Sequence, residues 1–155
     1  MDTVTKEKRS EMMSGIRSRN TKPELLIRKG LFKLGYRYRI NDKIYGKPDI
    51  VLKKYNAVIF IHGCFWHGHI GCDYFKIPKS NTQFWVEKIE KNRDRDAEVL
   101  NYLRANSWRI CIIWECAIRG KTQMKNYYKI INRISKWLTS KRIWIEITSD
   151  TYNKQ

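Results

Sequence analysis

The sequence predicts an α/β fold in which a mixed central sheet is flanked by helices. Short apolar runs, which suit buried strands, alternate along the chain with longer amphipathic segments that suit helices. At 155 residues, 42% of them hydrophobic, the chain is long enough to bury one core and too short for two. No repeat and no low-complexity linker divides it. We therefore expect a basic N-terminal arm over residues 1–20 and a single domain over residues 21–155.

The first half of the chain predicts a helix followed by strands. Residues 1–20 are basic and weakly periodic, which suits an arm that orders on a partner, a short helix or a disordered tail. Thr21 suits a helix N-cap, Pro23 the first turn and Gly35 the helix end. The expected apolar face of this helix contains Ile27, Leu31 and Leu34. The expected strands that follow are residues 36–40, 50–52 and 57–61.

The second half alternates helix and strand. Residues 82–105 predict a long helix, residues 109–114 an apolar strand and residues 123–138 another helix. Residues 142–148 alternate as an edge strand or a swapped C-terminal tail. One face of the long helix carries Trp85, Ile89, Asn92, Asp96, Val99 and Leu103. Its two polar members either are exposed by a curve of the helix or face an active centre. The apolar face of the second helix is expected to contain Tyr128, Ile131, Ile134 and Leu138.

The charge of the chain indicates a polyanionic partner. Lys and Arg outnumber Asp and Glu by 32 to 15, which gives a formal net charge of +17, far beyond what solubility needs. An anionic membrane surface would attract the same charge, but the sequence has no long apolar span and no cleavable signal. We therefore expect a nucleic acid rather than a membrane as partner. We also expect a cytoplasmic location, where the four cysteines stay reduced.

All three histidines and two of the four cysteines lie in one segment, residues 62–72. Imidazole ligates metals and moves protons near neutral pH, and the glycines of this segment let its donors converge. Three thiolates and one imidazole suit tetrahedral zinc, and a closed four-ligand site is structural rather than catalytic. Cys111 lies within an apolar strand and is expected in the core. The expected zinc ligands are Cys64, His69, Cys72 and Cys116. Reduced cysteines without a metal are the alternative.

The two remaining histidines have carboxylates within reach in the predicted fold. Asp49 begins one strand and His62 ends the next, so a hairpin would put both at the same edge of the sheet. A carboxylate that recruits Mg²⁺, with a histidine that activates water or protonates the leaving oxygen, is a workable phosphodiesterase site. Waters and the backbone carbonyl of Ile61 would complete the Mg²⁺ coordination. The other candidates are His67, Glu24 and Asp96. In the alternative, His62 only caps a strand end.

Two pairs of adjacent aromatic residues accompany the predicted site. Phe65-Trp66 lies in the glycine-containing loop, and Phe84-Trp85 lies near the start of the long helix. Aromatic side chains beside a basic surface commonly stack on bases or insert between them. Unstacking costs least at a mismatched pair, so an intercalating side chain can also sense a mismatch. Ordinary core packing is the alternative, and it suits Phe84 best.

These motifs resemble the very short patch repair (Vsr) mismatch endonuclease family over roughly residues 9–120. The most specific segment is His62-Gly63-Cys64-Phe65-Trp66-His67. The accompanying segments, in the expected order, are Asn20-Thr21-Lys22-Pro23-Glu24, Gly46-Lys47-Pro48-Asp49, Phe84-Trp85-x-Glu87-Lys88-Ile89-x-x-Asn92, and Trp108-Arg109 through Trp114-Glu115-Cys116.

The resemblance implies a restriction-endonuclease-like fold and Mg²⁺-dependent nicking of one DNA strand. The cut expected from the family lies 5′ of the T in a T:G mismatch, the product of 5-methylcytosine deamination. The implied partner is double-stranded DNA with that mismatch, bound by a monomer, with mismatch-repair proteins as further partners. The implied catalytic residues are Asp49, His67, His62 and Glu24, with Asp96 in support and Ile61 as the second Mg²⁺ ligand. The implied DNA contacts are Phe65, Trp66 and Trp85, to which we add Asn92. The four zinc ligands match those expected above.

The chain departs from the family pattern at the expected zinc site. The family usually has one residue between the zinc histidine and the next cysteine, whereas Ile70 and Gly71 both intervene here. We expect Gly71 to absorb the extra residue as a bulge. The Glu-x-Lys motif of conventional restriction enzymes is missing, so a two-carboxylate site of that type is not supported. Two other functions stay open: a zinc-stabilised, non-catalytic DNA-binding module, and a nuclease of the same fold with another DNA substrate.

Overall fold

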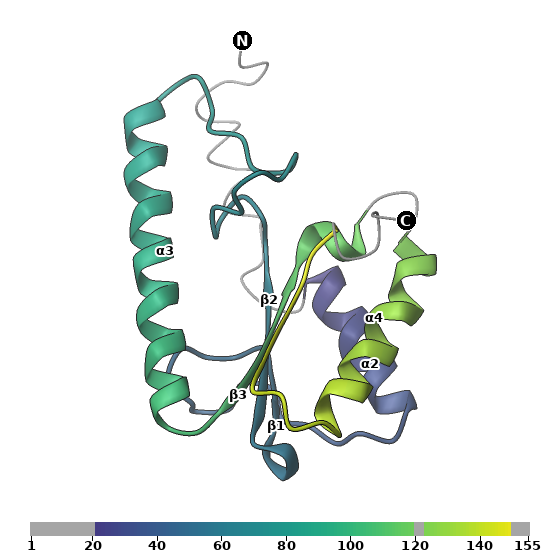
Figure 1. Cartoon of the computed structure of the whole chain (residues 1–155). Coiled ribbons are helices and arrows are strands. Elements are labelled where there is room, and N and C mark those ends of the chain that lie inside the picture. Colours follow the sequence, from purple (N-terminus) through teal and green to yellow (C-terminus); the bar gives the residue numbers. More distant parts are fainter. Residues whose placement is uncertain (1–20, 120–122, 150–155) are drawn as a thin grey trace.

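The computed structural model describes residues 21–119 and 123–149, and its central sheet has helices on both faces (Figure 1). The predicted N-terminal arm, residues 1–20, lies outside the described residues. The helices are α2 (Lys22–Lys33), α3 (Thr82–Ala105) and α4 (Gln123–Leu138), with 3₁₀ turns at Lys53–Tyr55 and Glu115–Ile118. The strands are β1 (Ile50–Leu52), β2 (Ala57–His62), β3 (Arg109–Trp114) and β4 (Trp144–Ile147). The predicted α/β class with a mixed sheet is confirmed.

The four strands lie in the order β1-β2-β3-β4. β1 pairs with β2 in the antiparallel sense, whereas β2–β3 and β3–β4 are parallel. Helix α3 connects β2 to β3, and α4 connects β3 to β4, because parallel neighbours need a crossover. His62 and Trp114 are paired residues at the carboxyl ends of β2 and β3. Several of the predicted site residues lie at this end of the sheet.

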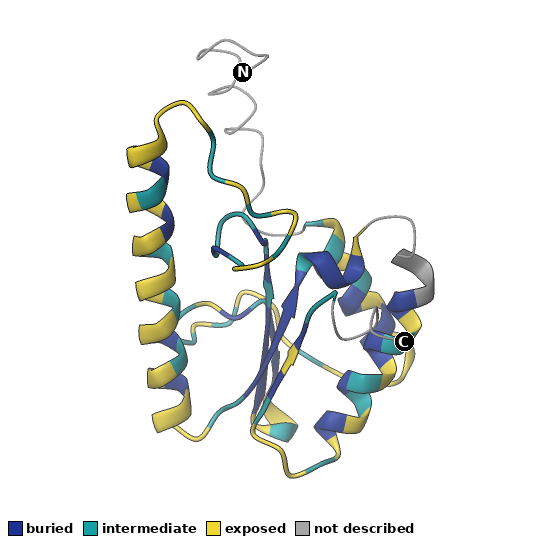
Figure 2. Ribbon diagram, turned by 45° about the horizontal axis from the view of Figure 1, so that its top comes forward, coloured by how far each residue is buried: buried dark blue, intermediate teal, exposed yellow. Residues whose placement is uncertain are grey.

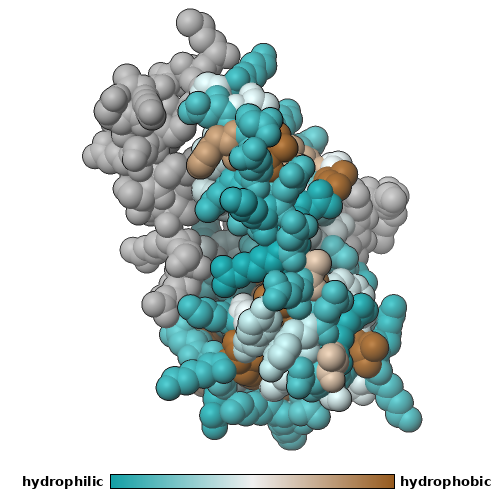
Figure 3. All heavy atoms as spheres, turned by 90° about the vertical axis from the view of Figure 1, so that its left-hand side faces the viewer, coloured by the Kyte–Doolittle hydropathy of each residue, from teal (hydrophilic) through white to brown (hydrophobic). Residues whose placement is uncertain are grey.

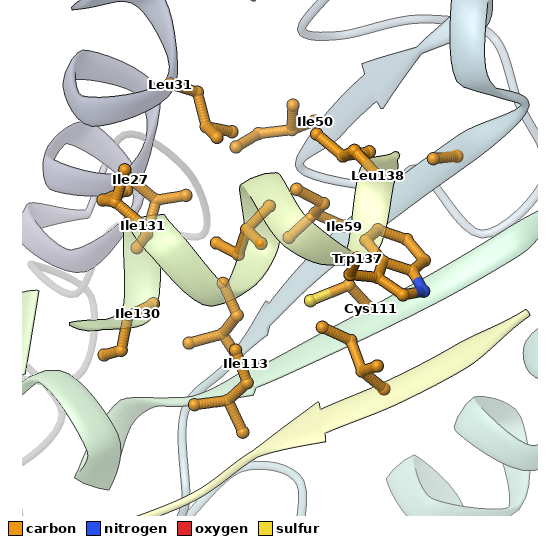
Figure 4. Packing of buried hydrophobic residues seen from close by; sticks show 14 of the residues in the cluster. Ile27, Leu31, Ile50, Ile59, Cys111, Ile113, Ile130, Ile131, Trp137 and Leu138 are labelled. Carbon is orange, nitrogen blue, oxygen red and sulfur yellow. The ribbon is translucent and has the colours of Figure 1, made fainter. Parts of the chain in front are cut away.

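Side-chain alternation along the strands divides the core into two apolar layers. Figure 2 shows that the strands are largely buried, and Figure 4 shows the packing in the layer that contains Ile59, Cys111 and Ile113. The layer beneath α2 and α4 includes Ile59, Ile113 and the fully buried Cys111, which was predicted in the core. The layer beneath α3 includes Val58, Phe60, Ile112 and Trp114, packed against Val99 and Leu103 of the helix. Since side chains two residues apart share a face of a strand, His62 follows Phe60 towards α3.

Helix α2 begins and ends as the sequence predicted. Thr21 is the N-cap, and its Oγ1 accepts a hydrogen bond from the Glu24 backbone N–H at 3.4 Å. At the other end the Tyr36 N–H donates to the Leu31 carbonyl at 3.0 Å, as in a Schellman motif. The cap fixes the start of α2 at the same end of the sheet as His62.

Two expectations next to α2 were wrong. Leu34 is the C-cap residue rather than part of the helix, and its side chain is 52% exposed instead of buried with Ile27 and Leu31. Residues 36–40 do not form a strand, and Arg39 makes a single bridge to Val51. The chain then takes a left-handed turn at Asn41, with φ of 57°, and leaves the edge of the short strand β1. Residues 36–40 do alternate between apolar and basic side chains. However, β1 is only three residues long, so it offers too few partners for a ladder of hydrogen bonds with this segment.

The C-terminal elements complete the sheet of the same chain. β4 pairs with β3 through Ile110↔Trp144 to Ile113↔Ile147, so this segment is an edge strand rather than a swapped tail. The predicted face of α4 was wrong by one position at its start: Tyr128 is 60% exposed, whereas Tyr127 is buried. Within the described part of the chain, no helix is long and apolar enough to cross a membrane.

Candidate active site

A cleft of about 590 Å³ at the carboxyl end of β2 gathers the predicted catalytic residues. Its walls come from the start of α2, the segment before β1, the loop after β2 and the middle of α3. The predicted site residues on these walls are Glu24, Asp49, Ile61, His62, Trp66, His67, Asn92 and Asp96. The predicted zinc ligands form a separate cluster nearby, and Phe65 and Trp85 lie outside the cleft walls.

Asp49 is held at one side of the cleft by the neighbouring strand. Its Oδ2 accepts a hydrogen bond from the Ile61 backbone N–H at 2.7 Å. The β1–β2 hairpin therefore brings Asp49 and His62 to the same edge of the sheet, as expected. Burial raises the pKa of Asp49 to about 7 against the opposing hydrogen bond from Ile61, and the nearby Glu24 adds to the rise. A carboxylate in this environment gains stability from a bound cation.

Glu24 supplies a second carboxylate from the first turn of α2. It is 3% exposed, and its Oε2 accepts a hydrogen bond from Arg28 Nη2 at 3.0 Å, one helical turn further on. The prediction that Glu24 points inward and needs a partner is confirmed. Asp49 and Glu24 thus line one cleft together with the backbone of Ile61. Oxygen donors of this kind fit Mg²⁺, which prefers carboxylates and carbonyls and keeps several waters.

His67 and Asp96 form a hydrogen-bonded pair between the loop and α3. The distance from His67 Nδ1 to Asp96 Oδ2 is 2.7 Å. Because an ionised carboxylate can only accept, this bond favours the tautomer with its proton on Nδ1 and leaves Nε2 as the basic nitrogen. The pair has the geometry by which a carboxylate orients a histidine for proton transfer.

The imidazole of His62 stacks on that of His67. Their ring centroids are 3.8 Å apart and the rings are nearly parallel, at 3°. Burial lowers the pKa of His62 to about 3, and the neighbouring His67 adds to the shift, so His62 is neutral at pH 7. Within the described residues, His62 Nδ1 is buried without a hydrogen-bond partner. In the described residues, Nδ1 therefore makes no strand-capping hydrogen bond.

The polar positions on α3 face the cleft rather than bulk solvent. The side-chain amide of Asn92 donates to the backbone carbonyl of Trp66 at 2.9 Å, and Asp96 binds His67. Above and below them, Ile89 and Val99 are buried. The sequence left open whether these polar residues are exposed by a curve of the helix or face an active centre; the structure shows that they line the cleft. The outer face of α3 is mostly hydrophilic (Figure 3).

Aromatic side chains pack together beside the cleft. Trp66 contacts Phe65 and Trp85 edge to face, with centroids 5.2 and 6.0 Å away. Phe65 also contacts Trp85, at 5.5 Å. Trp85 is only 8% exposed, whereas Phe65 and Trp66 are half-buried and Phe84 is 58% exposed. Of these residues, Trp66 is the one that reaches the cleft wall, and Trp85 supports it from α3.

Cys64, His69, Cys72 and Cys116 converge into one cluster, although Cys116 is distant in the sequence. Their ligand atoms all lie within 4.8 Å of one another. The hydrogen bond between Cys116 and Cys64 lowers the pKa of the Cys116 thiol to about 5, towards the thiolate form that zinc binds. Three sulfur donors and one imidazole at these separations fit tetrahedral zinc. The four described cysteines are free of disulfides.

The extra residue between His69 and Cys72 forms a turn rather than a bulge. The Cys72 N–H donates to the His69 carbonyl at 3.3 Å, and Gly71 lies between them at φ of +78°. The turn lets the longer segment return Cys72 to the cluster. Gly68 fixes the same loop against α3, since a Cβ there would lie 2.7 Å from Ile89 Cγ2. Cys64, His69, Cys72 and Cys116 together form what we call the zinc-ligand cluster. The loop after β2 supplies the first three of these residues and also lines the cleft.

Three residues of the site were missed by the sequence interpretation. Trp114 contacts all three histidines, but a tryptophan at the end of an apolar strand has no pattern that separates it from ordinary core. Lys47 and Arg95 line the cleft as exposed cations. Lys47 also takes a left-handed φ of 49°, which is uncommon for a non-glycine residue and frequent at functional sites. The position of Lys47, two residues before Asp49, was the only feature of the sequence that could have indicated its place in the cleft.

Comparison with known proteins identifies the relatives of this chain. A family model described as DNA mismatch endonuclease Vsr matches residues 1–73. The DNA mismatch endonuclease Vsr of Escherichia coli is 39% identical over 88% of this chain and 87% of its own length. The type II nicking enzyme V.NmeAIP of Neisseria meningitidis is 54% identical over 77% of this chain and 86% of its own length. V.HpaIIP of Haemophilus parainfluenzae, also named a type II nicking enzyme, is 45% identical over 88% and 94%.

These relatives are named as nicking enzymes or as a mismatch endonuclease. The alternative of a non-catalytic DNA-binding module is therefore wrong. The chain belongs to the Vsr family of DNA mismatch endonucleases, and it is an endonuclease that acts on DNA.

Proposed function

We propose that the protein nicks one strand of duplex DNA on the 5′ side of the T in a T:G mismatch and so initiates very short patch repair. The observation that carries the proposal is the His67–Asp96 pair, which lies in one cleft with Asp49 and beside the aromatic residues. The relative named a DNA mismatch endonuclease supports the choice of mismatched DNA. The relatives named nicking enzymes support cleavage of a single strand.

Asp49 and Glu24, with the carbonyl of Ile61, would hold Mg²⁺, which when bound stabilises negative charge on the phosphate. His67 acts as the general base, taking a proton from the attacking water at Nε2 while Asp96 holds Nδ1. His62, buried and neutral, keeps the ring of His67 in place by stacking. Lys47 and Arg95 contact the DNA phosphates on either side of the cleft.

Trp66 and Phe65 insert at the mismatched pair. Opening a base step costs a few kcal/mol in a duplex and is cheapest where pairing is already weak. Asn92 holds the Trp66 backbone to α3, so the inserting side chain keeps a fixed distance from His67. The net charge of +17 supplies the attraction that is independent of base sequence.

The zinc-ligand cluster has a structural role in this proposal. Zinc bound by Cys64, His69, Cys72 and Cys116 joins the loop to the end of β3, because its binding free energy becomes folding free energy. The protein works as a monomer, since a nick at an asymmetric mismatch needs one active site. Mismatch-repair proteins and a cytoplasmic location stay predictions.

The experiment that tests the function is nicking of end-labelled duplexes that differ at one base pair. T:G, T:A and C:G duplexes with several flanking sequences are incubated with Mg²⁺, and both strands are mapped. We expect one nick beside the T of the T:G duplex. Equal cutting of all three duplexes would identify a nuclease with another DNA substrate and reject mismatch recognition.

A further inference from the structure

All three histidines of the chain contact one indole, that of Trp114. His69 of the zinc-ligand cluster lies flat on it, with centroids 4.1 Å apart and an angle of 6°. His62 meets the same indole edge to face at 5.2 Å, and His67 does so at 6.4 Å. A single side chain thus lies between the zinc-ligand cluster and the histidines of the cleft.

The fold fixes this indole on two sides. Trp114 ends β3 directly beside His62, which ends β2, and both side chains face α3. The indole is 9% exposed. Its Nε1 donates a hydrogen bond to Glu146 on the edge strand β4. A side chain that is paired at its polar end and packed over its face has little freedom to rotate.

The contacts form a continuous series from one site to the other. His69 stacks on Trp114, Trp114 packs against the edge of His62, and His62 stacks on His67, which binds Asp96. Among the described residues no hydrogen bond holds His62 Nδ1, and the ring is packed between His67 and Trp114. A smaller side chain at position 114 would leave an empty volume beside His62 and let that ring turn.

We propose that Trp114 is a positioning residue, which uses the zinc-ligand cluster as a fixed support for the His62–His67 pair. It touches neither DNA nor the reacting atoms in this account. The inference rests on the proposed function, because it assigns His67 the proton transfer. Misplacement of a catalytic group by about 1 Å can slow a reaction by about 100-fold, so the effect should be on the rate of the chemical step rather than on DNA binding.

The test compares Trp114→Leu and Trp114→Phe with Trp144→Leu. Trp144 packs in the same apolar cluster but contacts Arg104 rather than a histidine, so it controls for lost burial. For each variant we would measure zinc content, affinity for the T:G duplex and the single-turnover nicking rate with excess enzyme. Long-range ¹H–¹⁵N spectra of the three imidazoles give a readout that needs no activity.

We expect Trp114→Leu to bind zinc and DNA as the wild type does and to nick about 30–100-fold more slowly. The signals of His62 and His67 should broaden or double in this variant. Trp114→Phe should recover most of the rate, and Trp144→Leu should stay within about threefold of wild type. A folded Trp114→Leu variant with wild-type rate and sharp imidazole signals would overturn the inference, and so would an equal loss of rate in Trp144→Leu. If the wild type itself fails to nick the T:G duplex, the proposed function fails, while the spectra still test the packing.

Discussion

The zinc-ligand cluster and the cleft share the loop that follows β2, yet they have opposite chemical character. The cluster draws three sulfurs and one imidazole into a group whose ligand atoms lie within 4.8 Å of one another. The cleft combines oxygen donors with two imidazoles around an open volume of about 590 Å³. Soft ligands that close around an ion suit a structural role, whereas hard ligands beside open space suit an ion that must also meet a substrate.

Two histidines that are close in the sequence have different hydrogen-bond partners. His67 turns towards α3 and binds Asp96, whereas His69 turns towards Cys116, with Nδ1 to Sγ at 3.6 Å. Gly68 lies between them in the left-handed region and packs against Ile89. The reversal of the chain at Gly68 separates the two sites.

Replacing His67 or His69 individually with alanine should give the largest effects on nicking and on zinc content. The two variants should differ in which of these properties they lose. His67→Ala removes the proposed general base, so we expect nicking to fall by at least about 1,000-fold, within the usual range for such groups. Zinc content and Tm should stay close to wild type, because His67 is not in the zinc-ligand cluster. Single-turnover nicking and metal analysis on the same protein sample measure both.

His69→Ala is the counterpart of His67→Ala at the zinc-ligand cluster. It should lose zinc and lower Tm by more than about 10 °C, because the free energy of metal binding is lost from folding. If His67→Ala loses zinc instead, the two histidines have been assigned to the wrong sites.

Trp66→Ala tests whether the aromatic residues beside the cleft recognise the mismatch. Stacking on a base contributes about 1–3 kcal/mol, so the preference for T:G over matched duplex should fall by about 10–100-fold. Affinity for matched DNA should change little. Phe84→Ala is the control, since Phe84 is exposed and contacts Trp85 rather than Trp66. Equal losses on matched and mismatched duplexes in Trp66→Ala would contradict base insertion.

Asp49→Asn should stabilise the metal-free protein while abolishing nicking. The pKa of Asp49 rises from 3.8 to about 7 on folding. Between these two pH values the folded protein holds a proton that the unfolded chain has released, so the free energy of unfolding contributed by Asp49 decreases as pH rises. At pH 8 without divalent cations, Asp49→Asn should therefore be more stable by about 2 kcal/mol, or roughly 4–8 °C in Tm.

Thermal denaturation of both proteins at pH 5 and pH 8 measures this difference. The titration of His62 affects both proteins alike and cancels from the comparison. Asp94→Asn, on the exposed face of α3, is the control and should leave Tm unchanged. Identical Tm values for wild type and Asp49→Asn at pH 8 would show that burial of this carboxylate carries no penalty.

Gly71→Ala should give the smallest effect. Its φ of +78° is unfavourable for alanine, but a Cβ there meets nothing within 4 Å. We expect the free energy of unfolding to fall by about 1 kcal/mol, while the protein keeps its full zinc content. Gly68→Ala, where the Cβ would collide with Ile89, should cost more and also slow nicking. Loss of zinc from Gly71→Ala would mean that the turn determines ligand geometry.

The sequence predicted residue types and element order better than it predicted pairing and contacts. The hydrophobic period placed Asp96 on the inner face of α3, and the strand ends placed Asp49 beside His62. Neither pattern could show that Asp96 binds His67, because that depends on how the loop folds back. The predicted strand at residues 36–40 failed for a related reason, since its alternation gave no information about the length of β1.

Trp114 is a second residue whose contacts could not be predicted from the sequence. In the sequence it ends an apolar run and could be ordinary core. Its contacts with three histidines arise only when β2 and β3 pair in register and the loop returns His67 and His69 to their ends. The one-position error at Tyr128 has a geometric cause as well, because neighbouring helical residues differ by about 100° in direction.

The most direct test of the two-site account is to control the two metals separately in one protein preparation. Protein is equilibrated in buffer freed of divalent cations, its zinc is quantified, and nicking of the T:G duplex is followed before and after Mg²⁺ is added. We expect about one zinc per chain, a folded protein that binds DNA without cutting it before Mg²⁺ is added, and full nicking once Mg²⁺ is present. Nicking that persists without Mg²⁺ while zinc is retained, or a folded protein with no zinc at all, would contradict it.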